Sequence, residues 1–395
     1  MARLGLPSRK IEAWRNTSLK FLNEHSFKPS NGAPDISADI KSTLLEKSIS
    51  NTQKIVFVNG FFVSELSKFD AKAIFVEQKL EIKTRSADDV SNLIQALNDI
   101  YNLNPVEIVI KDDLESPIQI FNFTSVVGSA EIVVSPKIKI VLKANKEAKI
   151  ILTHLGTKES YYLNNGHFLF DVEKEGRLTL VNHTDQSLNA YHFDMVTMSA
   201  SSGSTIKYFE LNFNALVTRH ELSLNLNGEN IQSQVFGASY LKSKQHCDSQ
   251  TYISHNQSHS QSEQVYKSLL DDDSHSVFSG TVYIAQGIVK ADSAQLNQNL
   301  LLSERAEVNS KPILRIYADD VKASHGSTMG QVSEDEIFYL QSRSISRAKA
   351  LVLLGQGFLN EVILRMESVE LKNYFSGELL RHMTSHENAL PKALD

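Results

Sequence analysis

Between residues 105 and 332 the sequence is a nearly unbroken succession of short runs in which β-branched and other apolar residues alternate with polar ones. Typical runs are VEIVIK, IKIVLK, RLTLVNH, HELSLNL and ILRIYA. Alternation with a period of two indicates half-buried strands. More than ten such runs with few helical patterns between them restrict this region to a β-sandwich, a β-barrel or a β-solenoid.

The turns between these runs favour the solenoid. Antiparallel folds with tight hairpins use Asn-Gly or Asp-Gly turns, and NNGH and LNGEN are the clear examples here. Polar stretches such as DSAQLNQNLLLS suit ladders of like side chains on successive coils. No strict repeat period emerges, so the other β folds stay open at this point. Because solenoid edges need protection, we expect helices to cap both ends.

The flanking regions have a different texture. Residues 7–22 carry a broken helical stripe, Asn59-Gly60 predicts a hairpin between two short strands, and residues 88–103 have a helical period. After the β region, Ser333 and Glu336 have capping-box spacing, and two wide apolar stripes follow before a frayed end. We therefore predict an N-terminal helical domain with a short hairpin (1–104), a β core (105–332) and a C-terminal helical domain (333–395).

Composition excludes several classes of function. The net charge of −6 and the pI of about 6.1 argue against a nucleic-acid binder, which needs a basic face. A single cysteine, Cys247, excludes a disulfide framework and a cysteine-rich metal site built by this chain alone. We see no secretory signal and no apolar run of about 20 residues. The expected protein is cytoplasmic and binds neither nucleic acid nor membrane.

Histidines near Cys247 are the first candidate ligands. His255 and His259 would lie about 13 Å apart on one strand, at roughly 3.3 Å per residue, which is too far for one metal ion. His246 and Cys247 would point to opposite faces of a strand, which argues against a catalytic pair. We expect structural or solvent-facing histidines and an inert thiol.

Two further stretches carry possible chemistry. Asp271–Asp273 could serve a β-helix enzyme that acts on carbohydrate, but consecutive aspartates in extended chain alternate faces, so a turn is favoured. His325 lies in a Gly/Ser-rich segment that we interpret as a turn with room for a partner's close approach. On local grounds a structural role for His325 has equal weight.

Residues 310–345 closely resemble the SufB/SufD family of iron–sulfur cluster assembly scaffolds. The resemblance rests on four motifs: Lys311-Pro312 with Leu314, Ala318 to Lys322, Ser324 to Gly330, and Phe338 to Arg343. An N-terminal block with Trp14 and Thr17 and several later blocks, including DSQTYISH and GFLNEVI, also match. The length and the single cysteine favour the SufD half of the family.

The resemblance implies a right-handed parallel β-helix between helical domains and a non-catalytic scaffold subunit. It implies pairing with a SufB-like subunit through the β-helix, binding of the SufC-like ABC ATPase through the C-terminal helices, and self-pairing when the chain is isolated. No tightly bound cofactor is expected, only transient iron or a nascent cluster shared with SufB. A carbohydrate-active β-helix enzyme and a structural adaptor without metal remain the alternatives.

The resemblance also assigns residues. His325 matches the SufD histidine expected to acquire iron or bind the cluster, and Ala323 stands where many members have cysteine. The expected interface turn consists of Lys322, Ser324, His325 and Gly326. The expected SufC-docking residues are Phe338, Leu340, Leu351, Leu354, Phe358 and Val362.

Overall fold

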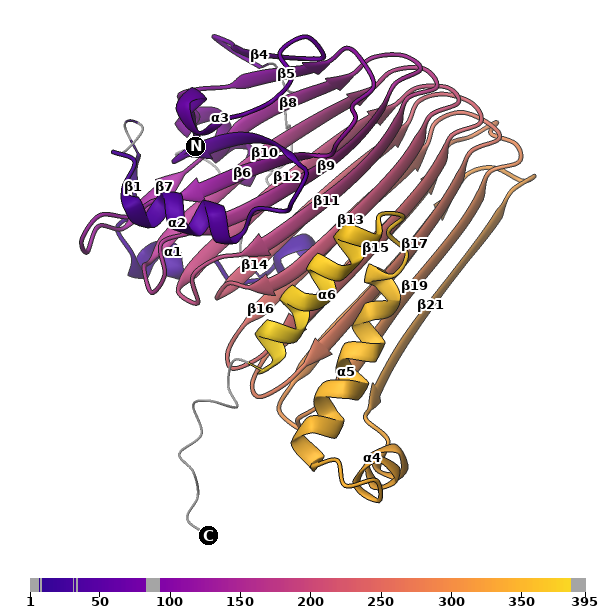
Figure 1. The fold of residues 1–395 in the computed structure, drawn as a ribbon. Coiled ribbons are helices and arrows are strands. Elements are labelled where there is room, and N and C mark those ends of the chain that lie inside the picture. The colour runs from indigo at the N-terminus through magenta and orange to yellow at the C-terminus, as the bar shows by residue number, and fades with distance from the viewer. Residues whose placement is uncertain (1–6, 8, 31, 33–34, 83–92, 385–395) are drawn as a thin grey trace.

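The structure, a computed structural model, describes residues 7, 9–30, 32, 35–82 and 93–384, and two long sheets dominate it (Figure 1). Within these residues, sheet A has 11 strands and sheet B has 10. Sheet A runs in the order β20 (Glu307–Ile316), β18 (His275–Ile284), β16 (His246–His255), β14 (Val217–Leu226), β12 (Ala190–Ala200), β10 (Tyr162–Val172), β8 (Lys137–Leu142), β5 (Val106–Ile110) and β4 (Ile74–Gln78), with β7 (Ile132–Val134) and β1 (Lys28–Pro29) attached beside β10. Sheet B runs in the order β21 (Lys322–Gln331), β19 (Asp292–Leu301), β17 (Gln261–Leu270), β15 (Gln232–Leu241), β13 (Thr205–Asn214), β11 (Arg177–Asp185), β9 (Glu147–Gly156), β6 (Ile118–Thr124), β2 (Gln53–Val58) and β3 (Phe61–Phe62).

From β8 to β21, successive strands of the chain alternate between the two sheets, and each pairs in parallel with the strand two positions away. This arrangement is a β-solenoid, which confirms the fold class predicted from the alternating runs. Arg177, Thr205, Gln232 and Gln261 occupy the same register position on successive coils of sheet B. Their unequal spacing explains why no repeat period is visible in the sequence.

The interior between the sheets is apolar over much of its length. Inward-facing side chains pack into one core that includes Ile55, Ile108, Ile140, Leu180, Met198 and Leu224. Like side chains also stack on neighbouring coils, as with the Ser262 and Ser293 hydroxyls, which are 2.8 Å apart. The predicted polar ladders are therefore present.

The N-terminal region lies against the solenoid along much of its length. It contains η1 (Glu12–Trp14), α1 (Phe21–Glu24), α2 (Ala38–Glu46), η2 (Ser64–Leu66) and α3 (Leu93–Tyr101). Antiparallel pairing of β2 with β3 confirms the hairpin at Asn59-Gly60, whereas residues 88–92 of the expected helix lie outside the described residues. Trp14 and Phe21 pack on the outer face of sheet A with Tyr191 and Phe193.

The C-terminal helices are α4 (Glu334–Gln341), α5 (Arg347–Ile363) and α6 (Val369–Thr384). Ser333 caps α4 by accepting a hydrogen bond from the Glu336 N–H, as the capping box predicted. The expected frayed end, residues 385–395, lies outside the described residues. In the part of the chain that the structure describes, no helix is both long and apolar enough to cross a membrane.

The prediction that these helices cap the end of the solenoid is wrong. α5 and α6 lie across the outer face of sheet B, over β13, β15 and β17 (Figure 1). That face carries Phe209, Phe213, Phe236 and Leu269, which pack against the helices. Covering an apolar face buries more surface than covering one edge strand would, so the helices lie on the face and β20 and β21 stay at an open end.

Candidate functional site at the open end of the solenoid

His325 lies within a regular strand and not in a turn, which corrects the interpretation of Lys322, Ser324, His325 and Gly326 as an interface turn. The segment Lys322–Gln331 forms β21, which pairs in parallel with β19 along its whole length. Glycine and serine disfavour strands locally, but the ladder to β19 outweighs that preference. The turn comes earlier, between β20 and β21.

The register of β21 shows which side chains face the inside of the solenoid. His325 pairs with Gln295 and Ser327 with Asn297, and both β19 residues are buried between the sheets. In-register parallel residues project to the same side of a sheet, so Ala323, His325, Ser327 and Met329 form the inner face of β21. A 2.8 Å hydrogen bond from the Ser327 hydroxyl to Ser310 on β20 confirms this orientation.

His325, Ser327 and Met329 are exposed, and Ala323 is half-buried, because no further coil covers them in the part of the chain that the structure describes. His325 is exposed, and Met329 is 62% exposed. On the opposite strand, the side chains of Leu314 and Ile316 are only partly covered. The inner faces of β20 and β21, which correspond to the buried interior of the preceding coils, therefore face solvent.

The two edge strands differ in their capacity to pair with another strand. Along a strand, alternate residues direct their backbone N–H groups to opposite sides. The Glu307 N–H donates toward β18, so residue 312 faces the open edge, where Pro312 has no N–H to donate. The Lys322 N–H donates toward β19, so Ala323, His325, Ser327 and Met329 direct their N–H groups to the open edge. β21 is the pairing-competent edge.

His325 continues a polar column inside the solenoid. Gln264, Gln295 and His325 share one register position on β17, β19 and β21. The Gln264 carbonyl oxygen accepts from the Thr251 hydroxyl at 2.7 Å, whereas neither side-chain polar atom of buried Gln295 has a partner among the described residues. Within the same residues His325 makes no hydrogen bond or ion pair, so its imidazole is free to act as a ligand.

The open end carries no thiol of its own. Ala323 occupies the inner-face position two residues before His325. Cys247 lies on β16, is 1% exposed, and contacts the hydroxyls of Ser239 and Ser249. Burial raises the pKa of Cys247 to about 12, which supports the expectation of an inert or weakly reactive thiol.

Three of the four residues of the expected interface segment face the other way. Lys322 and Ser324 alternate with the inner-face residues, and a Cβ at Gly326 would lie 3.3 Å from the Leu296 side chain. Leu296 packs toward the C-terminal helices, so Lys322, Ser324 and Gly326 lie on the outer face of β21. Only His325, of the four, lies on the inner face.

The six expected docking residues divide into two groups. Phe338 is 73% exposed on α4, and Leu340, Leu351 and Leu354 are half-buried. Val362 is 1% exposed within the core between α5 and sheet B. Phe358 packs against that same core, with the Lys267 ammonium 4.5 Å from the centre of its ring.

The histidines near Cys247 and the three consecutive aspartates have structural contacts or lie in turns. His255 is buried against the Ser260 and Ser262 hydroxyls, whereas His259 lies in the following turn. His246 contacts the Thr17 hydroxyl at 2.9 Å. Asp271–Asp273 forms a turn, as favoured from the sequence, and Asp273 pairs with Arg305.

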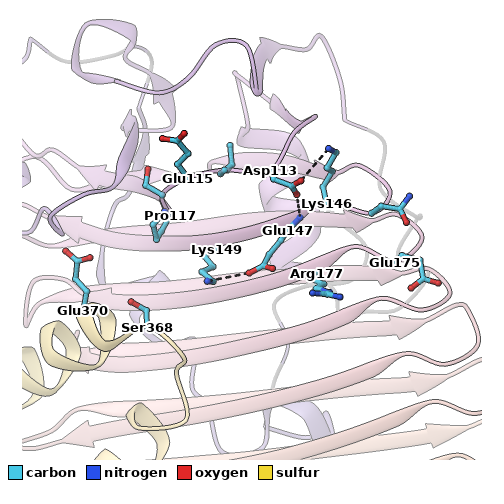
Figure 2. A pocket seen from close by; sticks show the side chains of 13 residues that line it. Asp113, Glu115, Pro117, Lys146, Glu147, Lys149, Glu175, Arg177, Ser368 and Glu370 are labelled. Atoms are coloured by element: carbon cyan, nitrogen blue, oxygen red, sulfur yellow. Dashed lines mark hydrogen bonds and ion pairs between the residues drawn. The ribbon is translucent and has the colours of Figure 1, made fainter.

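A polar hollow of about 790 Å³ lies where loops of several coils meet the start of α6 (Figure 2). Two of its lysines are already paired with carboxylates: Lys146 pairs with Asp112 and Asp113, and Lys149 pairs with Glu147. These pairs are solvent-exposed and of little energetic value. The hollow has no convergent set of buried polar groups.

The sequence analysis missed a cluster of titratable groups deep inside the solenoid. His154, His192, Asp194 and His220 face inward from three strands and are fully buried. Burial lowers the pKa of His154 and His192. Burial would also lower the pKa of His220, but the Asp194 carboxylate raises it to about 9. The sequence did contain a signal for this cluster. In the stretches THLG, AYHFD and TRHEL, histidine or aspartate occupies inward positions that are otherwise mostly apolar along these strands.

Comparison with known proteins agrees with this architecture. Residues 125–358 match the family described as SUF system FeS cluster assembly, SufBD core domain. An iron–sulfur cluster assembly SufBD family protein of Synechocystis is 28% identical over 92% of this chain and 84% of its own length. The iron–sulfur cluster assembly protein SufD of Escherichia coli is 27% identical over 94% and 88%, and the chloroplastic protein ABCI7 of Arabidopsis thaliana is 25% identical over 93% and 80%.

Proposed function

The chain belongs to the SufBD family of SUF-system iron–sulfur cluster assembly proteins and is of SufD type, and on this basis we propose that it is one half of a two-solenoid scaffold. Its partner is a SufB-like subunit, and the nascent cluster forms at the seam between the two. The observation that carries this proposal is the open end formed by β20 and β21. We propose the cytoplasm as its compartment.

The open end has the properties of a pairing surface. The free N–H and C=O groups of β21 are a template for a strand of another solenoid. Met329, Leu314 and Ile316 would become interior residues once a further coil covers them. A second copy of this chain offers the same edge, so a two-fold homodimer is the expected state when the SufB-like subunit is absent.

His325 is proposed to bind iron at this seam. Iron is the cargo of the scaffold and not a resident cofactor. An imidazole that is exposed and free of partners within the described residues is a suitable ligand for iron. Because Ala323 has no thiol and Cys247 is buried, the sulfur ligands would come from the partner subunit or from delivered sulfide.

The ATPase is proposed to dock on the exposed side of α4 and the first turns of α5. Phe338, Leu340, Leu351 and Leu354 supply the accessible apolar residues. Phe358 and Val362 instead anchor α5 to sheet B. Since α4 begins three residues after β21 ends, movement of α4 by the ATPase would act directly on the strand that carries His325. This chain itself is proposed to be non-catalytic.

Co-expression with SufB-like and SufC-like subunits of the same host tests the scaffold role. We expect one stoichiometric complex by size-exclusion chromatography and native mass spectrometry. A His325→Ala complex should assemble normally but reconstitute less cluster, whereas His259→Ala, which removes an exposed histidine in a distant turn, should behave as the unsubstituted chain. A SufB–SufC complex that excludes this chain would contradict the scaffold role.

Undiminished cluster formation by the His325→Ala complex would contradict the role of this histidine while leaving the scaffold role intact. A complex whose assembly and product never depend on iron would instead favour a structural adaptor.

A further inference from the structure

The cluster inside the solenoid joins strands of both sheets. His154 extends from β9 of sheet B, and His192 and Asp194 extend from β12 of sheet A. His154 Nε2 lies 3.8 Å and His192 Nε2 lies 3.5 Å from Asp194 Oδ2. All three ligand-type atoms lie within 4.8 Å of one another. Two imidazoles and one carboxylate thus converge on one point between the sheets.

The distances suit a transition-metal ion. With metal–ligand bonds of about 2.1 Å, ligand atoms around a tetrahedral ion lie about 3.4 Å apart. The two measured contacts to Asp194 are close to this separation. Two histidines with one carboxylate are a donor set used for Zn²⁺ and for Fe²⁺ in proteins.

His192 provides a second, independent indication. Its side chain is fully buried, Nδ1 has no partner within the described residues, and Nε2 has only the 3.5 Å contact with Asp194, which is long for a hydrogen bond. A buried polar group without a partner costs about 1–3 kcal/mol, so an imidazole retained in this position calls for a reason. Coordination of a metal ion by Nε2 would supply one.

The surrounding groups orient the carboxylate as a second shell does around a metal. His220 Nδ1 lies 2.6 Å from Asp194 Oδ1, and the Asn182 amide donates to Oδ2 at 2.7 Å. The His154 ring is held at both nitrogens, by the Asn122 amide nitrogen 3.1 Å from Nδ1 and by the Asn182 amide oxygen 2.9 Å from Nε2, so Nε2 would exchange the Asn182 contact for the metal ion. Such outer partners fix ligand orientation and raise metal affinity.

A second cluster of ligand-type side chains already holds a cationic side chain between its carboxylates. Asp185, Glu378 and His382 also lie within ligand distance of one another. Lys47 Nζ already lies between the two carboxylates, 2.6 Å from Asp185 and 2.8 Å from Glu378. An ammonium therefore lies between both carboxylates there, whereas the cationic partner of Asp194 within the described residues, His220, contacts Oδ1 and leaves Oδ2 directed toward His154 and His192.

We propose that His154, His192 and Asp194 bind one divalent transition-metal ion of the Zn²⁺, Fe²⁺ or Co²⁺ class, which links the two sheets inside the solenoid. This site is separate from the open end and does not depend on the proposed function. Because the cluster is closed off from solvent, the ion enters while the chain folds.

Cobalt is a suitable probe because its visible absorption reports coordination. The full chain carrying His325→Ala, which removes the exposed imidazole at the open end, is refolded with Co²⁺ and desalted. We expect about one Co²⁺ per chain and the intense absorption of a tetrahedral site. A chain that retains no Co²⁺ under these conditions overturns the proposal.

Two substitutions in that background locate the site. His192→Gln removes one ligand and should weaken Co²⁺ binding by at least the roughly 10- to 100-fold loss typical of outer-shell changes. His183→Gln is the matched control. His183 is also a fully buried imidazole whose nitrogens lack hydrogen-bond partners within the described residues. Its ring packs against Phe213 and Phe375 and lies outside the proposed metal site. Equal Co²⁺ affinity in both variants overturns the proposal.

If His192→Gln fails to fold, the proposal can still be tested without any substitution in the cluster. X-ray absorption of the Co²⁺-loaded background chain counts imidazole ligands directly. Two imidazoles with oxygen donors support the assignment, whereas one imidazole or none contradicts it.

Discussion

At the scale of residues, the open end has alanine at position 323 beside His325. Ala323 and His325 share the inner face of β21, two residues apart, so a thiol at 323 would lie beside the imidazole. The family resemblance had suggested such a pair. With alanine at position 323, no thiol lies beside His325 on this face of β21.

A thiol at position 323 should create a site with two ligands, the thiolate and the His325 imidazole. Ala323→Cys is expected to raise the affinity of the full chain for Co²⁺ by roughly tenfold or more, about 1.4 kcal/mol, with a new sulfur-to-metal absorption band. Lys322→Cys is the control, because residue 322 lies on the outer face of the same strand. If the two variants bind Co²⁺ equally well, the assignment of faces in β21 is wrong.

Cys247 should be silent in the folded protein. It is 1% exposed, and burial raises its pKa to about 12, so almost no thiolate exists at pH 8. We expect iodoacetamide labelling, followed by mass spectrometry, to be negligible in the native chain and complete in denaturant. Rapid labelling of the native chain would show that the β16 region opens.

At the scale of elements, an ionic network fastens α6 to the rest of the chain. Lys47, directly after α2, pairs with Asp185 of β11 and Glu378 of α6. Its backbone carbonyl also accepts from Gln119 and Tyr374. The network therefore connects an N-terminal helix, sheet B and the C-terminal helix.

Glu378→Gln tests this network. Burial would raise the pKa of Glu378, but the Lys47 ammonium more than offsets this and holds the pKa below its usual value. The pKa of Asp185 is lowered in the same way, with His382 and Lys47 outweighing burial. We expect a loss of roughly 1–3 kcal/mol in the free energy of unfolding at pH 7, measured by urea denaturation.

The pH dependence follows from the direction of these shifts. A carboxyl whose folded pKa is lowered stabilises the fold above its unfolded value, about 4.3 for glutamate, and this contribution is lost as the pH falls toward the folded pKa. The difference between Glu378→Gln and the unsubstituted chain should therefore shrink below about pH 4. The charged and titratable groups around Glu378 are Lys47, Asp185, His183, Arg381 and His382. A difference that grows on acidification would contradict this account.

The edge of β21 can be blocked without disturbing its internal ladder. Ser327 directs its N–H to the open side, so Ser327→Pro removes a donor that only a partner strand would use. If the isolated chain forms the proposed homodimer through this edge, the substitution should leave it monomeric in analytical ultracentrifugation. Ser327→Ala, which removes only the hydroxyl bond to Ser310, should leave the dimer intact. A dimer that survives Ser327→Pro would show that pairing uses another surface.

At the scale of the whole molecule, the N-terminal segment runs along the solenoid and connects distant coils. Trp14 is fully buried, with the Arg219 guanidinium 4.0 Å from its ring centre, and Thr17 donates to Asp248. Glu12 pairs with Lys311 of β20, next to the open end. The segment therefore stabilises the solenoid along its length.

Trp14→Ala should destabilise the whole chain. Truncation of a buried tryptophan costs about 3–5 kcal/mol, and here it also removes the ring beneath Arg219. Urea unfolding followed by far-UV circular dichroism measures the loss. Phe75→Ala, which truncates a 44%-exposed aromatic residue of β4, is the control and should change stability far less. Equal losses would indicate that the N-terminal segment does not support the fold.

The sequence by itself determined the succession of strands, the hairpin at Asn59-Gly60 and the cap of α4 at Ser333, and it favoured the solenoid, because these depend on periodicity, turn chemistry and capping, which are local. It also carried the motif around His325. Tertiary structure alone decided that His325 lies on an inner-face strand at an open end, since glycine and serine indicate a turn until a ladder to β19 forms. It also decided that α5 and α6 cover sheet B and that His154, His192 and Asp194 meet, because both depend on contacts between residues distant in sequence.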